Sequence, residues 1–193
     1  MRRYLAPALC LALLTACTST EGGAAAPRSS TTEATTSATT SASKATSPSS
    51  RPREINLDGK NPCDLMTAEQ LAAIAPTTAP RPGTTDTFKS PNCSFNADGA
   101  FWRVTTVVTE GIDAWTSGKR EGQPAAITPV AGFPAITVTL PTDQVLCNIA
   151  VDVADGQYLY TGFEVSEGFA DKFPKPCDGA RVVAEAVVQN LLK

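Results

Sequence analysis

The sequence has no histidine, and only 6% of its 193 residues are aromatic. The absence of histidine excludes Ser-His-Asp and Cys-His catalysis and any metal site with a histidine ligand. No apolar run reaches the roughly 20 residues that a membrane-spanning helix needs. Basic residues are scarce in residues 55–193, where 10 Lys and Arg stand against 16 Asp and Glu, a net charge of −6. An acidic segment without a basic stripe argues against nucleic acid as a partner.

The first 16 residues have the features of a signal peptide. Arg2 and Arg3 are followed by a ten-residue apolar core, Leu5–Leu14, which is too short to span a bilayer. Leu14-Thr15-Ala16-Cys17 resembles the bacterial lipobox, in which the cysteine is lipidated and becomes the first residue. We therefore expect a lipid on Cys17 to hold the protein on the extracytoplasmic face of the cell membrane. An ordinary secretory signal, with Cys17 there by chance, is the alternative.

Residues 17–54 are predicted to be a lipidated cysteine followed by a disordered tether. In residues 18–50, eighteen of 33 residues are Ser or Thr, seven are Ala, and none is both larger and apolar. Such a segment cannot bury enough surface to offset its chain entropy. A coil of this length has an end-to-end distance of roughly 30 Å. Its Ser/Thr runs either carry O-linked sugars or form a bare spacer, and the sequence leaves both open.

Residues 55–193 are predicted to form a single globular α+β domain that begins and ends with a helix. Thr67 and Gln70 make a capping-box pattern, which predicts a helix over 68–75. An apolar stripe at helical spacing predicts a second helix over 179–192, capped by Asp178. A short helix is expected around 112–117.

Between these helices apolar residues recur at every second position, which is typical of strands. The predicted strands are 93–97, 100–109, 135–140, 146–154 and 157–165. Asp-Gly pairs at 98–99 and 155–156 predict tight type I′ hairpins, and residues 76–92 and 118–133 are expected to be loops. We expect an antiparallel sheet of about five strands, with the N-terminal and C-terminal helices packed on one face.

Four cysteines remain once the leader and Cys17 are set aside, and an exported chain with an even number of cysteines is typically disulfide-bonded. Of the three connectivities we favour Cys63–Cys177 and Cys93–Cys147. Cys63 and Cys177 lie in matching Pro-Cys-Asp triplets ahead of the helices, whereas Cys93 and Cys147 lie on the apolar faces of strands. A metal site with four cysteine ligands is the alternative, but no Cys-x₂-Cys spacing occurs. We expect neither a metal nor a cofactor.

Short motifs follow one another in a recognisable order across residues 57–193. They are Asn-Pro-Cys-Asp-Leu at 61–65, Cys-Ser-Phe at 93–95, Cys-Asn-Ile-Ala-Val at 147–151, Asp-Gly-Gln at 155–157 and Pro-Cys-Asp at 176–178. This arrangement resembles the actinobacterial lipoproteins of the domain-of-unknown-function 3558 family. The resemblance implies an envelope lipoprotein with two disulfides, and it supplies no activity and no catalytic residues.

Candidate catalytic groups are few. Asp152, Asp155, Glu164 and Glu167 lie on or near the last predicted hairpin, and glycoside hydrolysis needs a pair of carboxylates. From the hairpin register we place Asp152 and Glu164 on opposite faces, so we predict no catalytic residues and no enzymatic activity. A carboxylate-based hydrolase of cell-wall polysaccharide is the alternative.

Tyr158, Tyr160 and Phe163 form the candidate binding surface on the last strand. The helices must cover one face of that strand, and the other face would present aromatic or aliphatic surface to an envelope protein, a lipid or a glycan. Coverage by a loop such as 118–133 is the alternative. We therefore expect a monomeric, non-enzymatic binding or accessory module of the cell envelope. A purely structural surface protein is the remaining alternative.

Overall fold

The computed structural model describes residues 50–193. The predicted signal peptide (1–16), the lipidation site Cys17 and most of the predicted tether (17–54) lie outside the described residues. The last residues assigned to the tether are in contact with the sheet. Arg51 Nη1 lies 2.5 Å from Asp152 Oδ1, and Arg51 Nη2 lies 2.5 Å from Asp155 Oδ1. Packing in the described chain thus begins at Arg51, ahead of the predicted domain start at residue 55.

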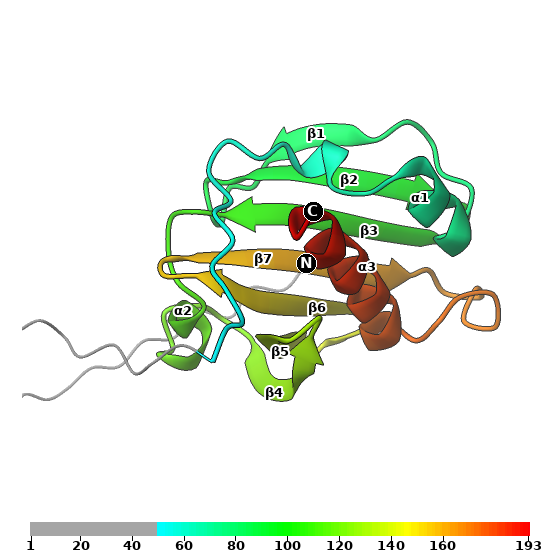
Figure 1. Ribbon diagram of the computed structural model, residues 1–193. Helices are drawn as coiled ribbons and strands as arrows, with labels where there is room; N and C mark the ends of the chain where they lie inside the picture. Colours follow the sequence, from blue (N-terminus) through cyan, green and yellow to red (C-terminus); the bar gives the residue numbers. More distant parts are fainter. Residues whose placement is uncertain (1–49) are drawn as a thin grey trace, which may run out of the picture. The chain divides into compact units, whose positions relative to one another are not determined.

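The strands of the described residues form one antiparallel sheet in the order β1-β2-β3-β7-β6-β5-β4 (Figure 1). They are β1 (Arg81–Thr84), β2 (Pro91–Ala97), β3 (Ala100–Val107), β4 (Gln123–Val130), β5 (Phe133–Leu140), β6 (Asp143–Ala154) and β7 (Gln157–Val165). The antiparallel sheet is confirmed, but it has seven strands where about five were predicted. The additional strands, β1 and β4, come from 76–92 and 118–133, which we predicted to be loops. Both are edge strands with mostly exposed residues and with prolines, so they lack the alternation of a half-buried strand.

The two Asp-Gly pairs connect adjacent strands through two-residue loops, as predicted. A type I′ turn requires positive φ at both loop residues. Gly99 and Gly156 have φ of 87° and 71°, but Asp98 and Asp155 are not among the positive-φ residues of the described chain. The type I′ prediction is therefore wrong, because only the second loop position uses the conformational freedom of glycine.

The helix α3 (Pro176–Leu191) crosses one face of the sheet and packs mainly against β6 and β7 (Figure 1). It begins three residues earlier than predicted, and its N-cap is Lys175 rather than Asp178. Proline suits the first turn because its φ is already helical and its missing N–H would have had no partner there. Leu191 of the predicted apolar stripe is only partly buried, and the other stripe residues are buried together with Gly179: Gly179, Ala180, Val183, Ala184, Val187 and Val188.

The helix α1 (Ala68–Ile74) carries the predicted capping box. Thr67 Oγ1 accepts a hydrogen bond from the Gln70 N–H at 3.2 Å, and Gln70 Oε1 accepts one from the Thr67 N–H at 2.9 Å. Near the end of α3, Asn190 Nδ2 donates to the same Gln70 Oε1 at 2.7 Å. The two terminal helices therefore lie together on one face of the sheet, as predicted.

Each face of the sheet has its own buried cluster. On the α3 face the rings of Phe95, Trp102 and Phe163 stack in succession, with centroids 6.0 Å and 5.8 Å apart. On the opposite face a smaller cluster forms beneath α2 (Asp113–Thr116), the short helix expected around 112–117. Its buried members are Phe88, Val107, Trp115, Val138, Ala150 and Tyr158. The sheet is thus covered on both faces, although only in part on the second.

The described cysteines form two disulfides, Cys63–Cys93 and Cys147–Cys177. The presence of two disulfides is confirmed, but the predicted pairing of Cys63 with Cys177 and of Cys93 with Cys147 is wrong. Cys93 and Cys147 do point toward the same core, but β3 and β7 separate their strands in the sheet. Three strand spacings amount to roughly 14 Å, about twice the Cα separation that a disulfide can bridge. Each strand cysteine bonds instead to the cysteine of the nearest Pro-Cys-Asp triplet, that of η1 (Pro62–Asp64) or that of α3.

Candidate functional site

The three residues predicted as a binding surface lie on two faces of β7. Phe163 points toward α3 and has no exposed surface. Tyr158 and Tyr160 point to the other face, where Tyr158 is also fully buried and Tyr160 is partly exposed. The predicted surface is therefore corrected: Phe163 and Tyr158 belong to the two buried clusters, and Tyr160 alone reaches the surface.

Two aromatic residues cover this second face, and neither comes from the segment 118–133. Trp115 of α2 stacks on Tyr160 with centroids 5.4 Å apart and an angle of 9° between the rings. Phe88, from the segment between β1 and β2, meets Tyr158 edge-on at 6.1 Å and Tyr160 at 5.1 Å. Much of 118–133 instead forms the edge strand β4. The rings of Phe88, Trp115 and Tyr160 thus make an aromatic wall at one end of the face.

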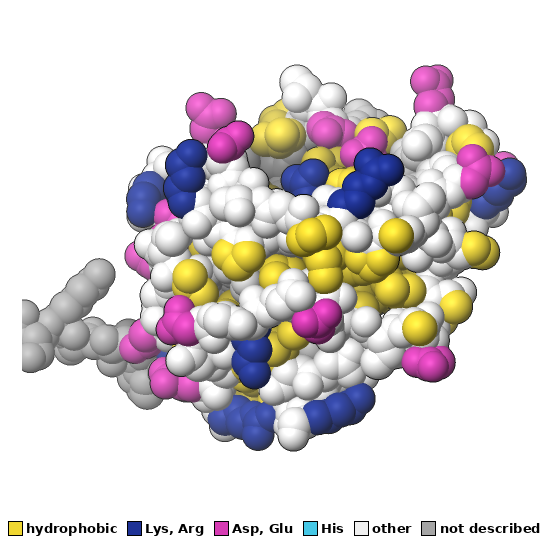
Figure 2. Space-filling view, turned by 90° about the horizontal axis from the view of Figure 1, so that it is seen from above, with side chains coloured by type: hydrophobic (Ala, Val, Ile, Leu, Met, Phe, Trp, Pro, Cys, Tyr) yellow, Lys and Arg dark blue, Asp and Glu magenta, His cyan; other side chains and the backbone are white. Residues whose placement is uncertain are grey.

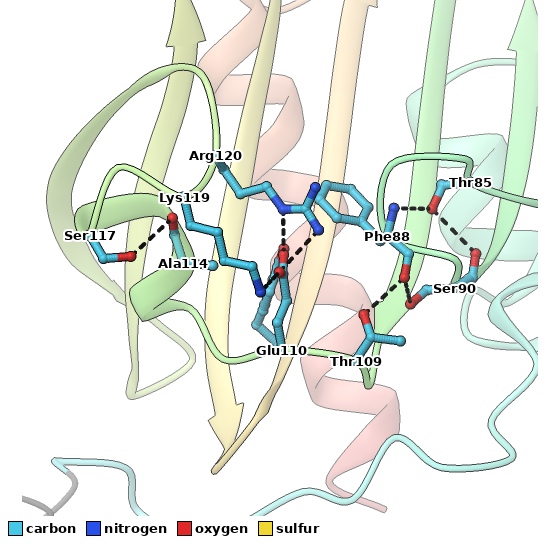
Figure 3. Close-up of polar contacts among 10 residues, drawn as sticks. Thr85, Phe88, Ser90, Thr109, Glu110, Ala114, Ser117, Lys119 and Arg120 are labelled. Atoms are coloured by element: carbon cyan, nitrogen blue, oxygen red, sulfur yellow. Dashed lines mark hydrogen bonds and ion pairs between the residues drawn. The ribbon is translucent and has the colours of Figure 1, made fainter.

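Glu110 anchors this cover from a buried position (Figure 3). Its Oε1 accepts hydrogen bonds from Arg120 Nε at 2.7 Å and from the Tyr158 hydroxyl at 3.1 Å. Its Oε2 accepts one from Arg120 Nη2 at 3.0 Å and lies 2.8 Å from Lys119 Nζ. Burial acts to raise the pKa of the Glu110 carboxyl, but the hydrogen bonds from Arg120 and Lys119 hold that pKa below its ordinary value. Each of these contacts stabilises the ionised form of the Glu110 carboxyl. The cluster therefore holds the 110–120 segment in place, and we call it the brace.

Arg120 also links this brace to the segment between β1 and β2. Its guanidinium lies over the Phe88 ring, 5.2 Å from the centroid. The backbone carbonyl of Phe88 accepts hydrogen bonds from Ser90 Oγ at 3.0 Å and from Thr109 Oγ1 at 2.8 Å (Figure 3). The aromatic wall is therefore held by polar contacts from two sides and is positioned in advance of any ligand.

Beside the aromatic wall, the sheet face is hollowed at Gly162. The register places Gly162 of β7 between Arg103 of β3 and Asn148 of β6. Along β7 its neighbours on the same face are Tyr160 and Glu164, two residues away on either side. Since Gly162 has no side chain, the four surrounding side chains enclose a space. A Cβ at Gly162 would lie 2.6 Å from Asn148 Oδ1, so the Asn148 side chain can take its observed position only because residue 162 is glycine.

We call this hollow the Gly162 groove. Its volume is about 250 Å³, and an adjoining hollow of about 520 Å³ continues toward residues 84–87 and Trp115. The lining residues of the first hollow are Thr85, Phe88, Phe101, Arg103, Thr105, Leu146, Asn148, Tyr160, Gly162 and Glu164. The mixture of aromatic rings with a small number of polar groups is typical of small-molecule sites.

The groove contains one cation that is poised for a ligand. The Arg103 side chain is exposed, and its guanidinium lies over the Phe101 ring, 5.1 Å from the centroid. Its Nε donates a long hydrogen bond of 3.4 Å to Ser94 Oγ. Within residues 50–193 no carboxylate forms an ion pair with it. Stacking on Phe101 therefore orients the planar guanidinium while leaving donors for another molecule.

Thr105 places a hydroxyl in the wall of the groove. Its side chain is fully buried, and Oγ1 has no hydrogen-bond partner among the described residues. A buried hydroxyl without a partner costs roughly 1–3 kcal/mol, so native structures rarely retain one without a reason. A ligand in the groove that reached this hydroxyl would supply the missing hydrogen bond.

The predicted acidic residues do not gather into a catalytic pair. Asp152 pairs with Tyr158 and Glu164 with Leu146, so the two carboxylates lie on the same face of the hairpin. Our prediction of opposite faces is wrong, because the register of β6 against β7 shifts between Asp152 and Ala154, so that Asp152 pairs with Tyr158 and not with Leu159. They are nevertheless six residues apart along β6, which corresponds to roughly 20 Å. Asp152 and Asp155 do lie near each other, but both are bound by Arg51.

Within residues 50–193, no three Cys, Asp or Glu side chains come together as metal ligands would. In the same range no helix has the length and apolarity needed to cross a membrane. Seen from the β1 edge, the surface has apolar side chains across its middle and charged side chains of both signs around them (Figure 2).

Sequence reasoning singled out Tyr160 as a surface aromatic and Glu164 as a candidate carboxylate, but it missed Arg103, Thr105 and Gly162. Each is an ordinary strand residue by itself, and no motif marks it. The signal that could have found them is the register across β3, β7 and β6, which aligns Arg103, Gly162 and Asn148 in one row. That row depends on β3 pairing with β7, a contact between distant segments that alternation alone does not predict.

Comparison with known proteins gives one match. No curated protein and no solved structure matches this chain. The model of a family described as "protein of unknown function (DUF3558)" matches residues 12–190, which is most of the chain and includes every strand and the four described cysteines. The chain that carries the Gly162 groove is therefore a member of the DUF3558 family.

Proposed function

We propose that this protein is a lipoprotein anchored through Cys17 to the extracytoplasmic face of the cell membrane. In this proposal its folded part is a non-enzymatic module that binds a ligand in the Gly162 groove. The lipobox-like sequence and the Ser/Thr-rich segment that follows it support the anchor and the reach of the tether. Two disulfides support export to an oxidising compartment.

The observation that carries the binding role is the Gly162 groove itself. Its aromatic wall is braced by Glu110, its cation is oriented by Phe101, and Thr105 in its lining has a buried hydroxyl without a partner among the described residues. These are features of a preorganised site, where little side-chain entropy is lost when a ligand binds.

The groove also lacks the arrangement that hydrolysis of a glycosidic bond requires. Glu164 is the carboxylate in the wall of the hollow, and Asp86 lies at the rim of the adjoining one. The Asp86 side chain is fully exposed and pairs with Lys89 at 3.6 Å, which leaves it outside the enclosed space. A binding role therefore fits this groove better than the carboxylate-based hydrolase that we kept as an alternative.

The anchor is tested by metabolic labelling of the full chain with radioactive palmitate in a bacterial host that processes lipoproteins. We expect label in the wild type, and loss of both label and membrane association in Cys17→Ser. A matched Cys10→Ser variant, altered inside the leader, should keep the label. Equal labelling of the Cys17→Ser chain would refute the anchor.

The binding role is tested with a photoreactive phenylalanine analogue in place of Phe101, which is partly exposed in the groove. Irradiation of intact cells should give a covalent adduct at this position. The control places the analogue at Val182, which is 49% exposed on α3 and therefore on the other side of the sheet. Adducts that are equal at both positions, or absent from both, would refute a specific groove ligand.

A further inference from the structure

We propose that the ligand of the Gly162 groove is a neutral saccharide. The inference rests on the proposed binding function and deepens it, since it names the chemical class of the ligand. It is carried by the polar groups of the groove, their balance of charge and the rings that stand beside them.

The polar groups match a ring that carries several hydroxyls. Arg103 offers N–H donors that no described carboxylate takes up, and Glu164 offers acceptors. The Asn148 side-chain amide offers its oxygen and the one N–H that does not donate to the Val138 carbonyl. These side chains surround Gly162 from three strands, so they converge on one space. Vicinal hydroxyls of a sugar donate and accept in the same region, which is the pattern that such a set of groups can satisfy.

The buried Thr105 hydroxyl points to the same class of ligand. Thr105 belongs to the lining of the groove, its side chain is fully buried, and its Oγ1 has no partner within residues 50–193. An acyl chain would leave this hydroxyl unsatisfied and would keep its energetic cost. A ligand hydroxyl would supply the missing hydrogen bond.

The charge balance favours a neutral ligand. In the hollow, the positive charge of Arg103 is matched by the negative charge of Glu164. A phosphate or a polyanion would be expected to meet several cations, as in sites that bind phosphate through arginine clusters. A cationic ligand would gain no net attraction, because Arg103 opposes what Glu164 contributes. A neutral polyhydroxylated ring uses both groups without leaving a net charge.

The aromatic residues complete the match. Tyr160, Phe88 and Phe101 line the same hollow as the polar groups. The C–H bonds of a pyranose carry partial positive charge and pack on the electron-rich parts of aromatic rings. The enclosed volume of about 250 Å³, with the adjoining hollow of about 520 Å³, leaves room for more than one sugar ring.

The test titrates the purified full chain with chitotriose and with maltotriose, two neutral oligosaccharides, and with trigalacturonate as the acidic counterpart. The readouts are calorimetry and tryptophan fluorescence, to which Trp115 contributes because it stacks on the groove residue Tyr160. We expect at least one neutral trisaccharide to bind, and trigalacturonate to bind more weakly than that one. The proposal would be overturned if neither neutral sugar gave heat or a fluorescence change at concentrations up to ~10 mM. That concentration is higher than the dissociation constant of the weakest specific binding expected at such a site.

Two variants make the test specific to the groove. Thr105→Val removes the hydroxyl at nearly constant volume and should reduce affinity roughly fivefold, the value of one hydrogen bond, without lowering the midpoint of urea unfolding. Arg103→Ala should reduce affinity roughly 10- to 100-fold. Arg181→Ala on α3, away from the groove, should bind as the wild type does. Sugar binding that both groove variants leave intact would overturn the site.

The photocrosslinking experiment separates failure of this inference from failure of the proposed function. A Phe101-specific adduct that stains for carbohydrate supports the saccharide. A Phe101-specific adduct that contains protein or lipid instead refutes the saccharide and leaves the binding role standing. No Phe101-specific adduct refutes both.

Discussion

Gly179 of α3 lies directly against the ring of Phe163 on β7. A Cβ at Gly179 would be 2.4 Å from Phe163 Cδ1 and 2.6 Å from Cγ, far inside normal contact distance. Because position 179 has no side chain, α3 can approach the sheet this closely near its start. Phe163, which the sequence suggested as part of a binding surface, is the residue over which the helix packs.

Gly179→Ala should destabilise the fold by about 1–3 kcal/mol, the usual cost of overpacking a core. This outcome opposes helix propensity, which favours alanine over glycine by roughly 1 kcal/mol. Urea unfolding measures the change, and Val182→Ala at an exposed position of the same helix should alter stability by less than about 0.5 kcal/mol. Adding Phe163→Leu should relieve part of the Gly179→Ala penalty, because the two residues are in contact. A stabilised Gly179→Ala chain would contradict the packing described.

Glu110→Gln should destabilise the protein by about 2 kcal/mol near neutral pH, because it leaves Arg120 and Lys119 without their buried counter-charge. The effect should depend on pH. The pKa of Glu110 is below its ordinary value of 4.5 in the folded state. The stabilisation of the folded state by the Glu110 carboxylate is therefore complete at pH values above 4.5, and it is lost as the pH falls through the folded-state pKa.

The difference in unfolding free energy between wild type and Glu110→Gln should accordingly shrink between pH ~5 and pH ~3. Urea unfolding at a series of pH values measures it. Glu121→Gln, an exposed position just past Arg120, serves as the control and should show no such trend. A difference that stays constant down to pH ~3 would show that the brace does not depend on the Glu110 carboxylate.

The disulfide pairing should be readable from a tryptic digest without reduction. Cleavage after Lys and Arg, except before Pro, places the four cysteines in the separate peptides 61–89, 90–103, 121–172 and 173–181. We expect cross-linked masses for 61–89 with 90–103 and for 121–172 with 173–181. A cross-link between 61–89 and 173–181 would instead support the pairing that we first derived from the sequence.

Each disulfide closes a span of 30 residues. Loop entropy then predicts a loss of about 3–4 kcal/mol when Cys63 and Cys93, or Cys147 and Cys177, are replaced together by serine. Urea unfolding of the two double variants measures this loss. Equal spans predict similar losses, so a large inequality would point to different strain in the two native bonds.

Thr67→Ala should weaken α1 by about 1 kcal/mol, because the Gln70 N–H loses its acceptor. Hydrogen exchange should accelerate at the first amides of α1 more than at those of α3. Thr142→Ala, at an exposed turn position, is the matched control and should leave exchange in α1 unchanged. Unchanged exchange in the Thr67→Ala chain would mean that α1 is held by packing alone.

Features that depend on neighbours in the chain were predictable. The capping box at Thr67 and Gln70, the apolar stripe of α3 and the two-residue loops at the Asp-Gly pairs follow from spacings of a few residues. The edge strands β1 and β4 were not predictable in this way, because an exposed edge needs no alternation of apolar residues. Within the candidate site, Tyr160 was found as an aromatic on a strand, while Arg103 and Thr105 resembled any exposed or buried strand residue.

The sequence by itself determined the spacing of apolar residues in each helix and strand, and the number of cysteines available to pair. It also determined on which face of its own strand each cysteine and aromatic side chain lies. Only the tertiary structure decided the strand order, and with it which cysteines meet and that Arg103, Gly162 and Asn148 share a row. The physical reason is that side-chain direction follows from local backbone geometry, whereas strand order results from packing among segments far apart in the chain.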